Sequence, residues 1–152
     1  MAEVLFYHLT QASLEATLPG LLERTLERGW RAVVRCGMAE RLEALDNLLW
    51  THAEESFLPH GIAGTGPPAR MPIYLTTGPE IPNRADVLFL IDGARAENAE
   101  MAALTRTVLL FDGRDEMALA AAREDWRRVT GAGLPAIYWS QEGGRWVKKA
   151  GG

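Results

Sequence analysis

The chain of 152 residues is poor in cysteine, histidine and basic residues. Cys36 is its only cysteine, so it can form neither an internal disulfide nor a zinc site built from several thiolates. His8, His52 and His60 lack the i, i+4 spacing that presents two imidazoles on one helical face, so the sequence indicates no metal site. Cys36 ends an apolar run, where the simplest interpretation is a small buried residue.

Long apolar runs and net positive charge are missing as well. No apolar run approaches the roughly 20 residues that span a bilayer, and the N-terminal segment has neither a basic lead-in nor a cleavage site. We therefore expect a cytoplasmic protein without membrane contact. Sixteen basic residues against twenty acidic ones give a net charge of −4. Because unaided binding to nucleic acid needs a cationic surface that releases counterions, we expect the chain to reach DNA only indirectly, through a partner.

The chain does contain a regular alternation of strand-like and helix-like segments. Apolar strand patterns occupy residues 3–9, 31–36, 71–77, 85–92 and 107–113. Helical patterns occupy residues 17–29, 38–50, 97–106 and 115–133, and a hairpin pattern occupies residues 135–150. Thr17 is the expected cap of the first helix and Gly29 its end. The alternation predicts one α/β domain over residues 1–152: a three-layer, doubly wound, mostly parallel sheet with helices on both faces and a C-terminal antiparallel hairpin at the edge.

Two acids, Asp92 and Asp112, follow apolar strands at the positions where such folds bind small ligands. A nucleotide site would also need the pattern G-x-x-x-x-G-K-[ST], in which backbone N–H groups and a lysine meet the phosphates. The glycine-rich segment GIAGTGPP (61–68) runs into two prolines and has no such lysine. We therefore interpret both acids as turn and capping residues and expect no cofactor, no metal and no catalysis by the chain itself. The alternative is a small metal- or nucleotide-dependent enzyme on a degenerate nucleotide-binding fold.

Two aromatic residues, Trp50 and Phe57, lie in a segment rich in proline, glycine and histidine, LLWTHAEESFLPHGIAGTGPP (48–68). Trp50 is the last residue of an amphipathic helical pattern, where a core position and a partly exposed contact are equally expected. Phe57 is expected in an irregular loop, where no helical period carries it inward. Because partly exposed aromatic residues are favoured at protein interfaces, the pair indicates a surface that binds another protein rather than a nucleotide.

A second group of residues lies on the last predicted helix. Arg123, Trp126 and Arg127 are spaced i, i+3 and i+4, which places them side by side on one face, with the tryptophan at the margin of the core. An apolar shelf between guanidinium groups suits a peptide that presents a hydrophobic side chain together with carboxylates. The pattern favours equally a solvated face on which Glu124 and Asp125 neutralise the arginines.

Several stretches together resemble one known family along essentially the whole chain. They are FYHL near the start, LDNLLWTHAEESFLPHGIAG, RADVLFLID, AREDWRRVTGAG and YWSQEGGRWVKKA. The second stretch is the most specific, because no general requirement of the fold explains a tryptophan, acids, SF, PH and glycines in that order. The family that the chain resembles is the chi subunit of bacterial DNA polymerase III.

The resemblance implies a non-catalytic accessory subunit of the clamp-loader assembly, with a nucleotide-fold-like architecture that binds no nucleotide. In that family, chi links the polymerase to single-stranded DNA-binding protein by holding its acidic C-terminal tail, and it also binds the psi subunit. The tail-binding positions correspond to Arg123, Trp126 and Arg127. The aromatic contacts for psi correspond to Trp50 and Phe57, a surface for which a repair helicase is a second candidate partner.

Overall fold

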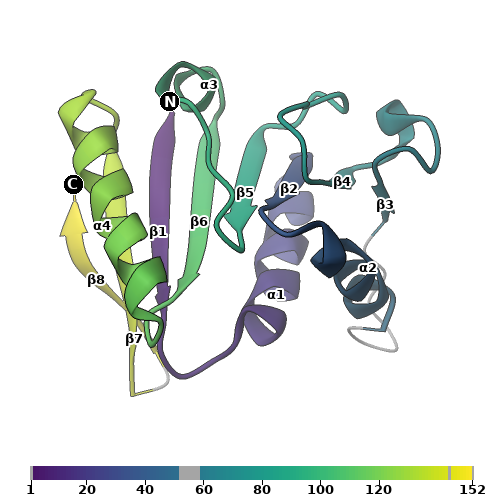
Figure 1. The fold of residues 1–152 in the computed structure, drawn as a ribbon. Coiled ribbons are helices and arrows are strands. Elements are labelled where there is room, and N and C mark those ends of the chain that lie inside the picture. The colour runs from purple at the N-terminus through teal and green to yellow at the C-terminus, as the bar shows by residue number, and fades with distance from the viewer. Residues whose placement is uncertain (1, 52–58, 144, 152) are drawn as a thin grey trace.

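Eight strands form one sheet in the computed structural model of the chain, which describes residues 2–51, 59–143 and 145–151 (Figure 1). In chain order the strands are β1 (Glu3–Leu9), β2 (Ala32–Cys36), β3 (His60–Ile62), β4 (Ile73–Thr76), β5 (Val87–Ile91), β6 (Arg106–Asp112), β7 (Ala136–Glu142) and β8 (Arg145–Gly151). Their order across the sheet is β3-β4-β2-β5-β6-β1-β7-β8. Neighbouring strands from β3 to β7 run parallel, and β8 runs antiparallel to β7 at the edge.

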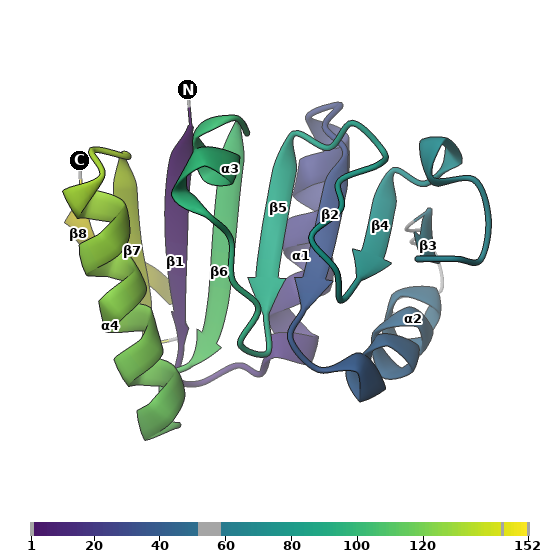
Figure 2. The ribbon, with the colours of Figure 1, turned by 45° about the horizontal axis from the view of Figure 1, so that its top comes forward.

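Helices cover the sheet from both sides. They are α1 (Leu14–Glu27), α2 (Leu42–Thr51), α3 (Asn98–Ala102) and α4 (Glu116–Gly131), with short 3-10 turns at η1 (Ala39–Arg41) and η2 (Pro68–Arg70). Figure 2 shows α3 and α4 in front of the sheet and α1 behind it. Leucines of α2 pack into the same core as those of α1. The predicted α/β class, with a mostly parallel sheet, helices on both faces and an edge hairpin, is confirmed.

The strands divide the hydrophobic core into two layers. In β1, Leu5 and Leu9 belong to the layer under α1 and α2, whereas Val4 and Phe6 belong to the layer under α3 and α4. This alternation follows from the period of two residues in a strand. All five residues of the central strand β5 are apolar and buried, because a parallel strand in this position is covered on both faces.

The start of α1 differs from the expectation. The helix begins one turn before Thr17, because the Ser13 side chain accepts a hydrogen bond from the N–H of Ala16 at 3.1 Å and caps it. Pro19 consequently lies inside α1 rather than in its first turn. Gly29 follows the helix in a left-handed conformation, with φ of +77°, and so ends it as predicted.

The segment that was expected to be a loop contains one strand. Residues His60–Ile62 form β3, which pairs in parallel with β4, so that His60 stands beside Ile73. A strand of three residues with a glycine at its centre has no hydrophobic period that could reveal it in the sequence. The helix expected over residues 97–106 is reduced to α3, because the strand β6 already begins at Arg106.

The strand β2 buries one charged side chain, Arg35. Its guanidinium donates to both carboxylate oxygens of Glu100 on α3, at 2.9 and 2.6 Å. It also donates to the carbonyls of Pro79 and Arg95, at 2.9 and 3.1 Å. The side chain of Arg35 is 6% exposed and that of Glu100 is 22% exposed. The hydrogen bonds from Arg35 lower the pKa of Glu100 below its ordinary value, so this ion pair ties α3 to the sheet.

We expect Arg35→Ala to lower the free energy of unfolding by about 3–5 kcal/mol, because the Glu100 carboxylate would stay largely buried without its partner. Urea unfolding followed by circular dichroism measures this loss. Because the pKa of Glu100 is lowered in the folded wild type, the contribution of the pair is complete above the ordinary value of 4.5 and is lost as pH falls below it. The difference between wild type and variant should therefore shrink in acid.

Arg95→Ala is the matched control for this experiment. Arg95 also pairs with a carboxylate, that of Asp125, at 2.9 Å, but its side chain is 63% exposed. Asp125 is itself buried, but it keeps a second cationic partner, Arg128 at 3.3 Å, when Arg95 is removed. The loss should therefore be about 0–1 kcal/mol, and the control should unfold nearly as the wild type does. Equal losses in the two variants would contradict a special role for the buried pair.

Candidate partner-binding surfaces

The outer face of α4 is built around Trp126. Its ring meets Phe6 of β1 edge-to-face, with centroids 5.3 Å apart, and Tyr138 of β7 in the same manner at 5.8 Å. Trp126 is half-buried and packs against the core layer under α4. It therefore lies at the margin of the core, as its spacing predicted, and side chains of two strands fix its orientation.

Two arginines flank that ring, and both are exposed. Within the part of the chain that the structure describes, neither Arg123 nor Arg127 forms an ion pair. The nearby Asp125 pairs instead with Arg95 at 2.9 Å and with Arg128 at 3.3 Å. Within the described part of the chain, neither Glu124 nor Asp125 therefore pairs with the two exposed guanidinium groups.

A histidine lies close to Arg123 at the end of the same aromatic cluster. The Nδ1 atom of His8 and the hydroxyl of Tyr138 are hydrogen-bonded at 2.9 Å. Burial lowers the pKa of His8 below its ordinary value; the charge of Arg123 lowers it further, while the Gly113 carbonyl and Asp112 act in the opposite direction. A carboxylate bound to Arg123 would offset that positive charge and favour protonation of His8.

A second surface lies at the end of α2. Trp50 is 54% exposed, and its ring rests against the imidazole of His60, with centroids 4.9 Å apart. The side chain of His60 is itself 0% exposed and is hydrogen-bonded to Asp46 at 2.9 Å. A buried, hydrogen-bonded histidine thus supports a tryptophan that faces solvent. Phe57 lies outside the described residues.

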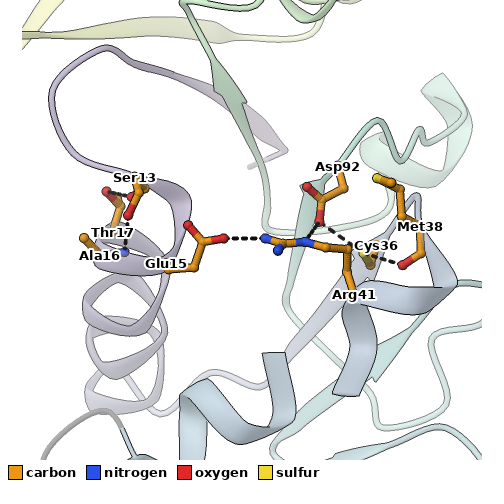
Figure 3. A network of polar contacts seen from close by, with 8 residues as sticks. All are labelled: Ser13, Glu15, Ala16, Thr17, Cys36, Met38, Arg41 and Asp92. Atoms are coloured by element: carbon orange, nitrogen blue, oxygen red, sulfur yellow. Dashed lines mark hydrogen bonds and ion pairs between the residues drawn. The ribbon is translucent and has the colours of Figure 1, made fainter. Parts of the chain in front are cut away.

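At the carboxyl edge of the sheet, Arg41 joins three elements (Figure 3). Its guanidinium pairs with Glu15 in the first turn of α1 and with Asp92 after β5, where Nε and Oδ2 are 3.2 Å apart. The thiol of Cys36 donates to Asp92 at 3.3 Å and to the carbonyl of Met38 at 3.2 Å. Cys36 is buried, as expected, and burial raises its pKa to about 11. The Asp92 carboxylate is therefore engaged by a guanidinium and a thiol.

A cavity of about 890 Å³ opens beside this network, between the first turns of α1 and α4. Asp112 lies in its wall and accepts hydrogen bonds from the backbone N–H of Arg114 at 2.9 Å and from its Nε at 3.2 Å. Asp112 thus holds a turn, as the sequence predicted. Across residues 2–51, 59–143 and 145–151, no three histidine, cysteine, aspartate or glutamate side chains are grouped so as to hold a metal ion.

Comparison with known proteins identifies the family. A sequence model of the family described as DNA polymerase III chi subunit, HolC, matches residues 1–136. The chain belongs to this family. The match ends at the first residue of β7, so the hairpin of β7 and β8 lies almost entirely beyond the matched residues.

Two relatives carry the name of chi. The probable DNA polymerase III subunit chi of Rickettsia prowazekii (strain Madrid E) is 30% identical over 91 residues, which cover 60% of this chain and 55% of that protein. The match thus spans little more than half the length of this relative. The DNA polymerase III subunit chi of Escherichia coli (strain K12) is 29% identical over 114 residues, covering 73% of this chain and 76% of that protein.

The candidate residues form two separate surfaces. Arg123, Trp126 and Arg127 lie together on α4, whereas Trp50 lies on α2, at the opposite end of the sheet (Figure 2). Sequence reasoning missed the aromatic residues of β1 and β7 beneath α4, because only strand pairing brings them there. Of the helices in the described parts of the chain, none is long and apolar enough to cross a bilayer.

Cys36 is expected to react slowly with Ellman's reagent while the chain is folded and rapidly in denaturant. A pKa of about 11 leaves only about one thiol in a thousand ionised at pH 8, and burial restricts access to it. Absorbance of the released thiolate measures the rate, and the single cysteine makes the signal unambiguous.

Asp92→Asn should accelerate the reaction of the folded chain, because the charge of Asp92 and its hydrogen bond with the thiol help to raise the pKa of Cys36. Asp112→Asn is the control, since Asp112 contacts Arg114 and not the thiol. Rapid reaction of the folded wild type, or the same acceleration in both variants, would contradict the network in Figure 3.

Proposed function

We propose that this chain, an accessory subunit of DNA polymerase III of the chi family, joins the replicase to single-stranded DNA-binding protein by holding the acidic C-terminal tail of that protein on α4. Arg123 and Arg127 bind carboxylates of the tail, and Trp126 forms part of the wall that receives a hydrophobic side chain of the tail. The chain catalyses no reaction itself, works with the clamp loader in the cytoplasm, and reaches DNA through this partner.

The observation that supports the tail site is the pair of exposed arginines on either side of a tryptophan held in place by two strands. Guanidinium groups without ion pairs in the described structure can form charge-assisted hydrogen bonds with an incoming carboxylate at little cost. A ring that is already packed on one side loses little conformational freedom on binding. Arginine and tryptophan are also the residues that most often dominate the energy of an interface.

We also propose that the surface around Trp50 and Phe57 binds the psi subunit, or a repair helicase in its place. The exposure of the Trp50 ring and its support by a buried histidine favour an interface residue over a core residue. Because α2 and α4 lie at opposite ends of the sheet, the two partners can be bound at the same time (Figure 2).

Arg123→Ala is expected to weaken binding of a tail peptide from the cognate single-stranded DNA-binding protein by roughly ten- to a hundred-fold. Loss of a charge-assisted hydrogen bond costs about 1.5–3 kcal/mol, which corresponds to that range of affinity. Isothermal titration calorimetry measures it. Arg70→Ala, at an exposed arginine on η2, is the control and should bind the peptide as the wild type does. Unchanged binding by a correctly folded Arg123→Ala chain would refute the tail site.

Trp50→Ala is expected to abolish co-purification with psi, because truncation of an interface aromatic that acts as a hot spot costs about 2 kcal/mol or more. The melting temperature should fall only slightly, since the ring is more than half exposed. Met117→Ala is the control, as Met117 is 83% exposed and lies on α4. Should Trp50→Ala instead melt far below the wild type and still bind psi, the residue belongs to the core.

A further inference from the structure

None of the described helices covers one face of the sheet at β1, β7 and β8. The pairing register places Trp139 next to Tyr7, and Trp146 of β8 opposite Gln141, so both tryptophans project on the same side of the sheet as Tyr7. This side faces away from α4 and towards the layer of α1. Both ribbon views show α1 behind β5 and β2 rather than behind these strands (Figures 1 and 2).

The aromatic rings on this face are half-buried and keep part of their surface open. The rings of Tyr7 and Trp146 meet edge-to-face, with centroids 4.9 Å apart and an angle of 80° between the planes. In such a pair each ring leaves at least one flat face uncovered by the other. A further planar group can therefore stack on this surface.

Three arginines gather beside Tyr7. A hollow of about 110 Å³ between α1 and the sheet is lined by Tyr7, Arg24, Arg28 and Arg106, and no carboxylate lies in its wall. Arg24 and Arg28 stand one helical turn apart, are exposed, and form no ion pair with any described residue. Arg106 forms an ion pair with Glu3, in which Nη2 and Oε2 are 2.6 Å apart.

The contacts around the hollow orient these groups. The guanidinium carbons of Arg28 and Arg106 lie 5.1 and 5.2 Å from the centroid of the Trp30 ring, within the range of cation–π contacts. The Tyr7 hydroxyl has no hydrogen-bond partner among the described residues. Burial raises the pKa of Tyr7 above its ordinary value and Glu3 acts in the same direction, while Arg106, Arg24 and Arg28 lower it. A phenol donor and three guanidinium groups, one of them paired with Glu3, therefore converge on one small space.

We propose that this face binds single-stranded nucleic acid. A backbone phosphate occupies the hollow, where Arg24, Arg28 and the Tyr7 hydroxyl donate to its oxygens. Adjacent bases stack on Trp146 and Trp139. A phosphate offers several acceptor oxygens to converging donors, and stacking on aromatic rings accepts any base. An acidic peptide would satisfy the arginines but would leave the row of flat rings without a partner.

The net charge of −4 limits the strength of this contact without excluding it. Binding depends on the local field, and the charged side chains that line the hollow are all arginines, of which Arg24 and Arg28 form no ion pair with any described residue. If Arg24 and Arg28 both meet phosphates, the logarithm of the binding constant should fall with the logarithm of salt concentration with a slope of about −1.4, because each contact on a single strand contributes about 0.7. The contact is therefore weak in isolation. The chain still reaches DNA through its partner, as proposed above, and this face meets the strand once that partner holds it nearby.

The experiment is fluorescence anisotropy of a labelled oligothymidylate of about 12 nucleotides, a length within the usual site sizes, titrated with the full chain at low salt. The double variant Arg24→Ala/Arg28→Ala should bind at least about tenfold more weakly, and its salt slope should be smaller by about 1.4. Trp146→Ala should lose at least about fivefold, because stacking of one base is lost. Trp139→Ala provides an independent test, and urea unfolding verifies that each variant is folded.

Arg70→Ala is the matched control and should bind the oligonucleotide as the wild type does. Three outcomes would overturn the proposal: no binding of the oligonucleotide at low salt, even where inorganic phosphate binds; binding by the arginine double variant equal to that of the wild type; or binding by both tryptophan variants equal to that of the wild type. An oligoglutamate peptide that displaces the oligonucleotide at equal concentration would also overturn it and assign the face to an acidic protein. The site is independent of Arg123, so these results do not bear on the tail site.

Discussion

A parallel sheet must be covered on both faces, and the surfaces of this molecule follow from how its helices meet that requirement. The central strands β2 and β5 are fully buried, because α1 and α2 pack on one face and α3, together with the segments around Ile81 and Ala94, packs on the other. Towards β7, α4 covers one face and the described helices leave the other open (Figure 2). The candidate tail site lies on the outside of α4. The face that carries Tyr7, Trp139 and Trp146 lies where the described helices leave the sheet uncovered.

The arginines divide into two groups that the total charge conceals. Arg35 and Arg41 each connect separate elements through carboxylates, and so belong to the structure. Arg24, Arg28 and Arg123 have no ion pair with any described residue and lie next to aromatic rings. An acidic chain can therefore carry positively charged binding surfaces, because most of its carboxylates lie elsewhere or are already paired.

The fold class could be predicted from the sequence because most strands are short apolar runs and the longer helices have a clear hydrophobic period. The face of α4 was predictable for the same reason, since i, i+3 and i+4 positions adjoin on any helix. The aromatic contacts beneath that face could not be predicted, because Tyr138 reaches Trp126 only through the pairing of β7 with β1. The strand β3 was missed because three residues define no period.

The start of α1 shows a similar limit. Ser13 and Thr17 are both capable caps, and the choice between them depends on where the chain turns after β1. The side-chain oxygen of Gln141 accepts hydrogen bonds from three consecutive backbone N–H groups, at 3.0, 2.9 and 3.0 Å, over residues 10–12. A residue near the far end of the chain thus sets the turn that precedes the cap, and no local pattern reports it.

Both edges of the sheet are poor templates for a further strand. At one edge β3 offers only three residues, and at the other β8 carries Arg145, Lys148 and Lys149. Short strands and lysines at an edge discourage pairing with the backbone of another chain. Copies of the chain gathered at one place would therefore keep their sheets separate, because neither edge favours the addition of a strand from another copy.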